Sequence, residues 1–216
     1  MIADMKIAIP IFDRFTALDA VGPYEVLSRL PGATVHFLAA EPGPKRTETA
    51  MLALTADLAL EELTDPDVVV VPGGYGTRAL TEDDQILGWL RRAHETSLWT
   101  TSVCTGSLLL GAAGLLDGLE ATTHWLALGA LAEYGAIPVA RRVVEHPHAR
   151  IVTAAGVSAG IDMALMLAAR IAGDEVAQAI QLGIEYDPQP PFDSGSPSKA
   201  PSAVVDLVRE NAGTLA

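Results

Sequence analysis

Short apolar runs alternate along this chain with longer segments in which apolar residues recur at helical spacing. Residues 5–11, 33–40 and 98–103 have the length and composition of strands. The run of four valines at 68–71 has no polar alternation, and it ends at Pro72-Gly73-Gly74. A strand of this kind is typical of a parallel sheet that helices cover on both faces.

Helical spacing predicts helices at 22–29, 83–95, 107–113, 125–134, 158–171 and 174–185, and residues 143–145 and 151–153 are expected to form a strand pair. The order is that of repeated βα units. We therefore expect an α/β fold in which two layers of helices enclose a mainly parallel sheet. A single domain over residues 1–216 is expected, with a proline-rich arm at about 187–201 and a short helix at 203–210.

Composition narrows the classes of function. The net charge of −13, with only 14 Lys and Arg, argues against a nucleic-acid partner. No apolar run is long enough for a membrane span, and the N-terminus lacks the basic and apolar regions of a signal peptide. The single cysteine cannot form an internal disulfide, so the cytoplasm is the expected compartment.

That cysteine, Cys104, lies between the strand at 98–103 and the helix at 107–113. A sharp strand-to-helix turn is where α/β enzymes carry a nucleophile, and the N-terminus of the following helix is expected to favour the thiolate. Gly106 leaves room for the bend. The alternative is that Cys104 is only a small buried apolar residue.

A nucleophile needs a proton partner and donors for developing charge. Asp19 follows the first strand, at the same edge of the sheet as Cys104, and is a candidate acid and base; its alternative role is a helix N-cap. Backbone N–H groups of the Gly73-Gly74 turn and of Thr105 are candidates for an oxyanion-type pocket beside the sulfur. The alternative for the glycine pair is a tight strand exit.

The histidines are weaker candidates. His124 is expected to cap the helix at 125–134 or to pack at a subunit contact, and Asp162 to act near the rim of the site or in its helix. The remaining histidines show no spacing typical of a metal centre. No metal or organic cofactor is expected.

Motifs over nearly the whole chain resemble the ThiJ/PfpI family, which is similar to class I glutamine amidotransferases: LDAVGP at 18–23, VVVVPGG at 68–74, VCTGSLLLGAAGLLDG at 103–118, ATTHW at 121–125 and GVSAGIDMAL at 156–165. The run at 180–197, IQLGIEYDPQPPFDSGSP, resembles the C-terminal segment of the isocyanide (isonitrile) hydratases of that family.

The resemblance implies a flavodoxin-like α/β sandwich, a homodimer, and hydration of an isocyanide to a formamide through a thioimidate. Position by position, it implies that Cys104 is the nucleophile, Asp19 the acid and base, Thr105 a catalytic neighbour and Gly74 a glycine whose amide faces the site. Protease-like and glyoxalase-like relatives usually carry histidine after the cysteine. This chain has Thr105, which favours the hydratases.

Two other functions stay open. A similar domain stands at the front of AraC-type transcription regulators, where it senses a ligand and does not catalyse. Such proteins carry a further basic helix-turn-helix portion, which we do not expect in this acidic chain. A reactive Cys104 could also serve as a redox sensor by oxidation to the sulfinate.

Overall fold

The computed structural model describes residues 4–212, which form a body up to Ile184 and a C-terminal unit from Glu185. A seven-stranded sheet in the order β10-β11-β7-β6-β1-β2-β5 runs through the body. Its strands are β1 (Met5–Pro10), β2 (Ala33–Ala39), β5 (Leu58–Ala59), β6 (Val68–Val71), β7 (Trp99–Val103), β10 (Val143–His146) and β11 (Ile151–Ala154). Neighbours pair in parallel except β10 with β11.

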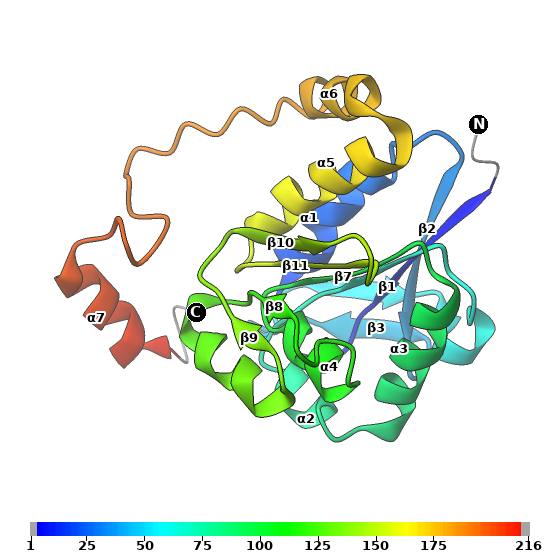
Figure 1. The fold of residues 1–216 in the computed structure, drawn as a ribbon, viewed down its shortest axis with the longest axis horizontal. Helices are drawn as coiled ribbons and strands as arrows, with labels where there is room; N and C mark the ends of the chain where they lie inside the picture. Colours follow the sequence, from blue (N-terminus) through cyan, green and yellow to red (C-terminus); the bar gives the residue numbers. More distant parts are fainter. Residues whose placement is uncertain (1–3, 213–216) are drawn as a thin grey trace. The chain divides into compact units, whose positions relative to one another are not determined.

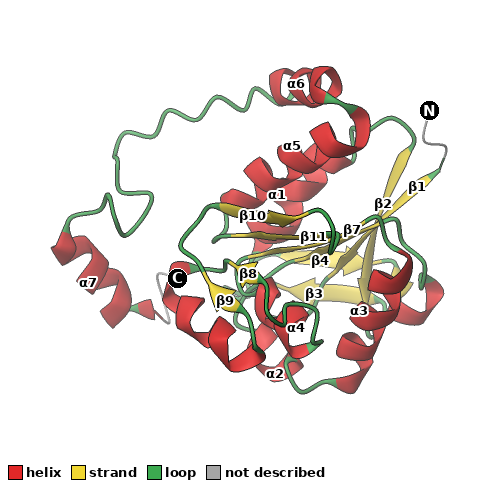
Figure 2. Ribbon diagram, in the orientation of Figure 1, coloured by secondary structure: helices red, strands yellow, loops and turns green. Residues whose placement is uncertain are grey.

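Helices cover both faces of this sheet (Figure 1). On one face α1 (Ala17–Leu27) packs against α5 (Ala159–Ala172), and α6 (Asp174–Gly183) packs against α5. On the other face lie α3 (Asp84–Thr96) and α4 (Gly106–Ala112), with the short α2 (Thr77–Leu80) against α4. Figure 2 shows the same layering by element type. The predicted three-layer α/β/α sandwich with a mainly parallel sheet is confirmed.

The order of the strands creates a switch point beside β1. From β1 the chain passes through α1 to β2 on one side, whereas β6 lies on the other side and leads on to β7. The helices that follow β1 and β6 therefore lie on opposite faces of the sheet, and the carboxyl ends of the strands at such a point are the usual ligand site. Asp19, Gly73 and Cys104 follow β1, β6 and β7 at this edge.

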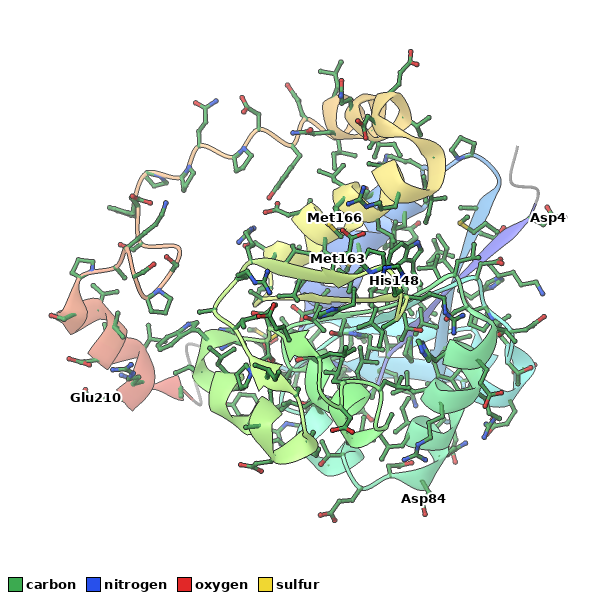
Figure 3. The ribbon with its side chains drawn as sticks, in the orientation of Figure 1. Asp4, Asp84, His148, Met163, Met166 and Glu210 are labelled. Atoms are coloured by element: carbon green, nitrogen blue, oxygen red, sulfur yellow. The ribbon has the colours of Figure 1, made fainter. Side chains whose placement is uncertain are left out.

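Burial explains why the apolar runs form central strands. All four valines of β6 are fully buried between β1 and β7. The buried faces of α3 and α5 include Trp89 and Met163, and Figure 3 labels Met163 together with Met166 on α5. Apolar area removed from water on both faces of the sheet is the main stabilising contribution to this arrangement.

The structure differs from the sequence-based expectation in several elements. The helix expected to begin at Gly22 begins five residues earlier, at Ala17. A glycine followed by a proline is typical of a helix start, but here Gly22-Pro23 lies within α1. The segment Trp125–Tyr134 is a 3₁₀ helix, η2, and not an α-helix. The sequence analysis missed the hairpin of β3 (Gly43–Arg46) and β4 (Ala53–Ala56), the short strands β8 (Glu120–Ala121) and β9 (Ile137–Pro138), β5 and the 3₁₀ turn η1 (Leu60–Glu62).

The C-terminal unit consists of an irregular proline-rich segment followed by α7 (Ser202–Glu210). An ion pair between Lys199 and Asp193 lies within it. Val204 and Leu207 of α7 are exposed. Within residues 4–212, no helix has the length and hydropathy that a membrane span requires.

The central packing predicts a specific loss of stability when Trp89 is replaced by Phe. Trp89 is fully buried, and its indole Nε1–H donates to the carbonyl of Leu63 at 2.9 Å. The smaller ring leaves that carbonyl unpaired and opens a gap, so we expect the free energy of unfolding to fall by about 2–4 kcal/mol. Urea unfolding measures this loss. Trp99→Phe is the matched control on the partly exposed first residue of β7 and should cost less; equal losses would contradict the account.

Candidate active site

Cys104 occupies the sharp turn between β7 and α4 that the sequence predicts. Its φ of 55° lies in the left-handed region, which is uncommon for a residue with a side chain. Its N–H faces the carbonyls of Ala154 and Ala155, both at 3.1 Å, and its carbonyl accepts from the hydroxyls of Ser107 at 3.1 Å and Thr123 at 2.8 Å. Hydrogen bonds on both sides of the residue thus hold a strained backbone in place.

Two glycines let the neighbouring loop approach this turn. A Cβ at Gly106 would lie 2.1 Å from the carbonyl oxygen of Val71, at the end of β6. A Cβ at Gly73 would lie 2.5 Å from the backbone nitrogen of Thr105 and 2.9 Å from the Cβ of Cys104. Only residues without a side chain allow the loop after β6 to touch the cysteine turn.

Asp19 is fully buried in the first turn of α1. Its Oδ2 accepts from the backbone N–H of Gly73 at 2.9 Å. Oδ1 is also buried and makes no hydrogen bond of normal geometry with any residue in 4–212. The N-cap of α1 is Thr16, so the alternative of Asp19 as an N-cap is wrong. The Gly73 hydrogen bond accounts for one oxygen of this buried carboxyl, and the unsatisfied Oδ1 favours a chemical role for the other.

The environment of Asp19 favours its neutral form. Burial is the largest cause and raises the pKa of Asp19 from 3.8 to about 7, with a smaller rise from the charge of Glu48. The Gly73 hydrogen bond and the thiol of Cys104 act in the opposite direction. A carboxyl group with this pKa can both give and accept a proton near neutral pH.

The N-terminus of α4 favours a Cys104 thiolate, as the sequence suggests, but burial of the thiol outweighs this effect. Burial, followed by the charge of Asp19, raises the pKa of the Cys104 thiol far above its usual range. The backbone N–H groups of Thr105 and Val157 and the hydroxyl of Thr105 oppose this rise without overcoming it. Because the two groups are neighbours, they titrate as a coupled pair, and the carboxyl loses its proton first.

Thr105 and Gly74 are engaged with each other. The N–H of Gly74 donates to Thr105 Oγ1 at 2.9 Å, and that hydroxyl lies 3.2 Å from the Gly74 carbonyl, to which it can donate. The Gly74 amide is therefore occupied by the threonine, and its role toward a substrate stays a prediction. The hydroxyl has a single proton, which can point to the Gly74 carbonyl or to the sulfur.

Sequence reasoning missed Val157, whose backbone N–H points to the thiol. Val157 has a φ of 46°, a genuine outlier for a β-branched residue. Nothing in the residue type signals this conformation, so only the structure reveals the donor. It also missed Gly73 as the donor that holds Asp19.

The structure gives contacts for the two secondary candidates. His124 caps η2 through a hydrogen bond from the Leu126 N–H to Nδ1 at 3.4 Å, which confirms its expected capping role. Asp162 forms an ion pair with Arg142. The part of the chain that the structure describes has no group of three or more His, Cys, Asp or Glu suited to hold a metal ion.

Comparison with known proteins decides the family. The model of the DJ-1/PfpI family matches residues 5–170, a span that holds Asp19, Gly73, Cys104 and Val157. This chain belongs to the DJ-1/PfpI family. A solved member, a ThiJ/PfpI family protein from Pseudomonas syringae, is 38% identical with a TM-score of 0.90, and the match covers 96% of this chain and 87% of that one.

Two curated relatives are informative. An isonitrile hydratase of Pseudomonas putida is 46% identical over 208 residues, which are 96% of this chain and 90% of the relative. An HTH-type transcriptional regulator, CdhR of Pseudomonas aeruginosa, is 35% identical over 173 residues, but these are 78% of this chain and 50% of the regulator. Sequences similar to this chain thus occur both in a hydratase and in a transcriptional regulator.

The coupled pair predicts that Asp19→Asn speeds alkylation of Cys104. The substitution removes the negative charge that helps to raise the pKa of the thiol, so the thiolate fraction rises at any pH above that at which Asp19 ionises. At about pH 8 we expect iodoacetamide to modify the variant several times faster than the wild type. Asp57→Asn, on an exposed side chain, should have no effect. Slower alkylation of Asp19→Asn would contradict the predicted coupling.

The same carboxyl predicts a pH-dependent change in stability. Between the usual pKa of 3.8 and about 7, the unfolded chain loses the Asp19 proton while the folded chain keeps it, so stability falls as pH rises through this window. The amide that replaces the carboxyl in Asp19→Asn stays neutral throughout. We therefore expect this substitution to raise the free energy of unfolding by a few kcal/mol at about pH 8 and by much less at about pH 4. Urea unfolding at the two pH values checks this, and a gain that is larger at the lower pH would contradict it.

Proposed function

We propose that this chain is an isonitrile hydratase, which adds water to an isocyanide to give an N-substituted formamide. The observation that carries the proposal is the 46% identity to the Pseudomonas putida isonitrile hydratase over 96% of this chain. That match extends beyond the family model, which ends at residue 170. The site supports the proposal because it provides a thiol and a carboxyl group that exchanges protons near neutral pH.

The resting pair holds one proton in the active form. With Asp19 ionised and Cys104 a thiol, a transfer of the thiol proton to the carboxylate gives the thiolate and the carboxylic acid. The total charge of the pair does not change in this step, so a buried site can accommodate it. The N–H groups of Thr105 and Val157 and the Thr105 hydroxyl stabilise the sulfur as its charge develops.

The first half of the reaction forms a thioimidate. The Cys104 sulfur attacks the terminal carbon of R–N≡C, and the Asp19 carboxylic acid gives its proton to that carbon. The product is R–N=CH–S–Cys104, and Asp19 is again a carboxylate. The proton now on carbon is the one that the thiol carried at the start.

The second half hydrolyses the thioimidate. Asp19 takes a proton from water, the hydroxide attacks the former isocyanide carbon, and Asp19 passes the proton to nitrogen. The C–S bond breaks as the hydroxyl oxygen becomes the formyl oxygen, and its proton returns through Asp19 to the sulfur. One water is consumed, R–NH–CHO leaves, and the pair holds one proton again.

A ligand-sensing domain is the second candidate, supported by the match to CdhR. The hydratase is preferred because its identity is higher and its match covers more of both chains. A homodimer, implied by the family resemblance, remains part of the proposal. Size-exclusion chromatography with light scattering tests it independently of activity.

The mechanism predicts the effects of two substitutions and of pH. Cys104→Ala has no nucleophile and Asp19→Asn no proton carrier, so we expect each to lower kcat/KM for an aryl isocyanide by at least about a thousandfold. For the wild type, kcat/KM should rise with pH through about 7, as the doubly protonated pair loses a proton, and then stay level.

Formamide production, followed by liquid chromatography for several isocyanides, measures these effects. Asp57→Asn is the matched control for the aspartate and should keep wild-type activity, because its side chain is exposed. Wild-type activity in Cys104→Ala would refute the mechanism. No turnover of any isocyanide by the wild type would favour the sensor.

A further inference from the structure

The side chain of Thr16 does not cap the helix that it precedes. Thr16 is the N-cap of α1, yet its side chain makes no capping hydrogen bond to that helix. A threonine in this place normally satisfies an N–H of the first turn. Its hydroxyl instead donates to Oε1 of Glu48 at 3.1 Å. The backbone of Thr16 is held by the site itself, because its N–H donates to the carbonyl of Gly73 at 2.9 Å.

Glu48 reaches this position from the turn that joins β3 to β4, a hairpin that sequence reasoning missed. Its backbone N–H donates to the carbonyl of Phe15 at 3.0 Å, and the adjacent Thr47 pairs with Phe15 as an isolated parallel bridge. The Glu48 carboxyl is therefore held both through its backbone and through its side chain. Both contacts lie at the entry to α1, within four residues of Asp19 along the chain.

The charged groups around Asp19 leave the Glu48 carboxylate free to raise its proton affinity. No Lys or Arg within residues 4–212 forms an ion pair with Glu48. At the end of β3 the guanidinium of Arg46 donates to the carbonyl of Ala50, and that of Arg14 lies over the ring of Tyr75. The groups that act on Asp19 are Glu48 from the hairpin, the Cys104 thiol from the β7–α4 turn, and the Gly73 N–H. The N-terminal dipole of α1 opposes Glu48.

We propose that Glu48, held by Thr16 over the entry to α1, is a positioning residue that sets the proton affinity of Asp19. The inference rests on the proposed hydratase for its consequence in turnover, but the electrostatic contact itself does not depend on a substrate. Glu48 touches neither sulfur nor substrate in this account. It acts through Asp19 alone.

The chemical consequence follows from the shared proton. In the singly protonated pair, Asp19 must take the proton of the thiol before the sulfur attacks. A nearby negative charge makes the Asp19 carboxylate a stronger base and so favours the thiolate form of the pair. Without Glu48, Asp19 ionises at lower pH and holds the thiol proton less well.

The test compares Glu48→Gln with the wild type. The glutamine side chain of this variant retains an oxygen for the Thr16 hydroxyl but has no charge. In pH profiles of kcat/KM for an aryl isocyanide, we expect the acid limb to move to lower pH by on the order of half to one unit. The plateau should fall about three- to tenfold, because the carboxylate is a weaker base.

Iodoacetamide alkylation of Cys104 provides a second profile that needs no isocyanide. Its acid limb should shift in the same direction and by a similar amount. Thr16→Val removes the hydroxyl that holds Glu48 while keeping the backbone and the charge, and we expect a smaller shift of the same sign. If circular dichroism shows that Glu48→Gln does not fold, Thr16→Val alone tests the role of Glu48. Glu175→Gln, an exposed site on α6, is the charge-matched control and should match the wild type.

The outcomes separate the two proposals. If the wild type turns over isocyanides but the acid limbs are unchanged in Glu48→Gln and Thr16→Val, the role of Glu48 is overturned. The proposed hydratase activity would not be affected by that result. A shifted alkylation profile without turnover of any isocyanide would support Glu48 as the partner of Asp19 and refute the hydratase. A fall in activity without any shift of either profile would show a merely structural role and would also overturn the inference.

Discussion

The burial of the Asp19 carboxyl beside the Cys104 thiol is the constraint on which the site depends. Each group would lose most of its hydration as an ion, so the space between α1 and the cysteine turn disfavours a second negative charge. The pair is therefore expected to hold a single proton over a wide pH range, which the proposed function uses. This property distinguishes a proton-shuttling thiol from a permanently ionised one, and it suits a reaction that must protonate carbon in one step and activate water in the next.

The fold provides this juxtaposition through the order of its strands. Asp19, Gly73 and Cys104 follow three adjacent strands at one edge of the sheet, and the absence of side chains at Gly73 and Gly106 allows their loops to touch. Backbone donors from Gly73, Thr105 and Val157 then orient the carboxyl and the sulfur. The C-terminal unit, which lies beyond the match to the family model, is not needed for any of these contacts.

The sequence reveals the features that local pattern controls. The valine run of β6, the elbow at Cys104 and the family motifs lead directly to the sandwich and to Asp19 and Thr105, which the structure brings to the same site. The pattern could not reveal the positive φ of Val157, the hairpin that carries Glu48 or the direction of the thiol pKa shift. These depend on contacts between segments far apart in the chain, and burial outweighs the helix N-terminus that the local pattern emphasises.

Infrared difference spectroscopy of the resting protein tests the shared proton most directly. The single cysteine gives one S–H band, and comparison with Asp19→Asn identifies the carboxyl band of Asp19. The account predicts that the protonated carboxyl band disappears with a midpoint near pH 7 while the S–H band persists. Loss of the S–H band in that transition, with the carboxyl band retained, would contradict it, because the thiol would then be the stronger acid of the pair.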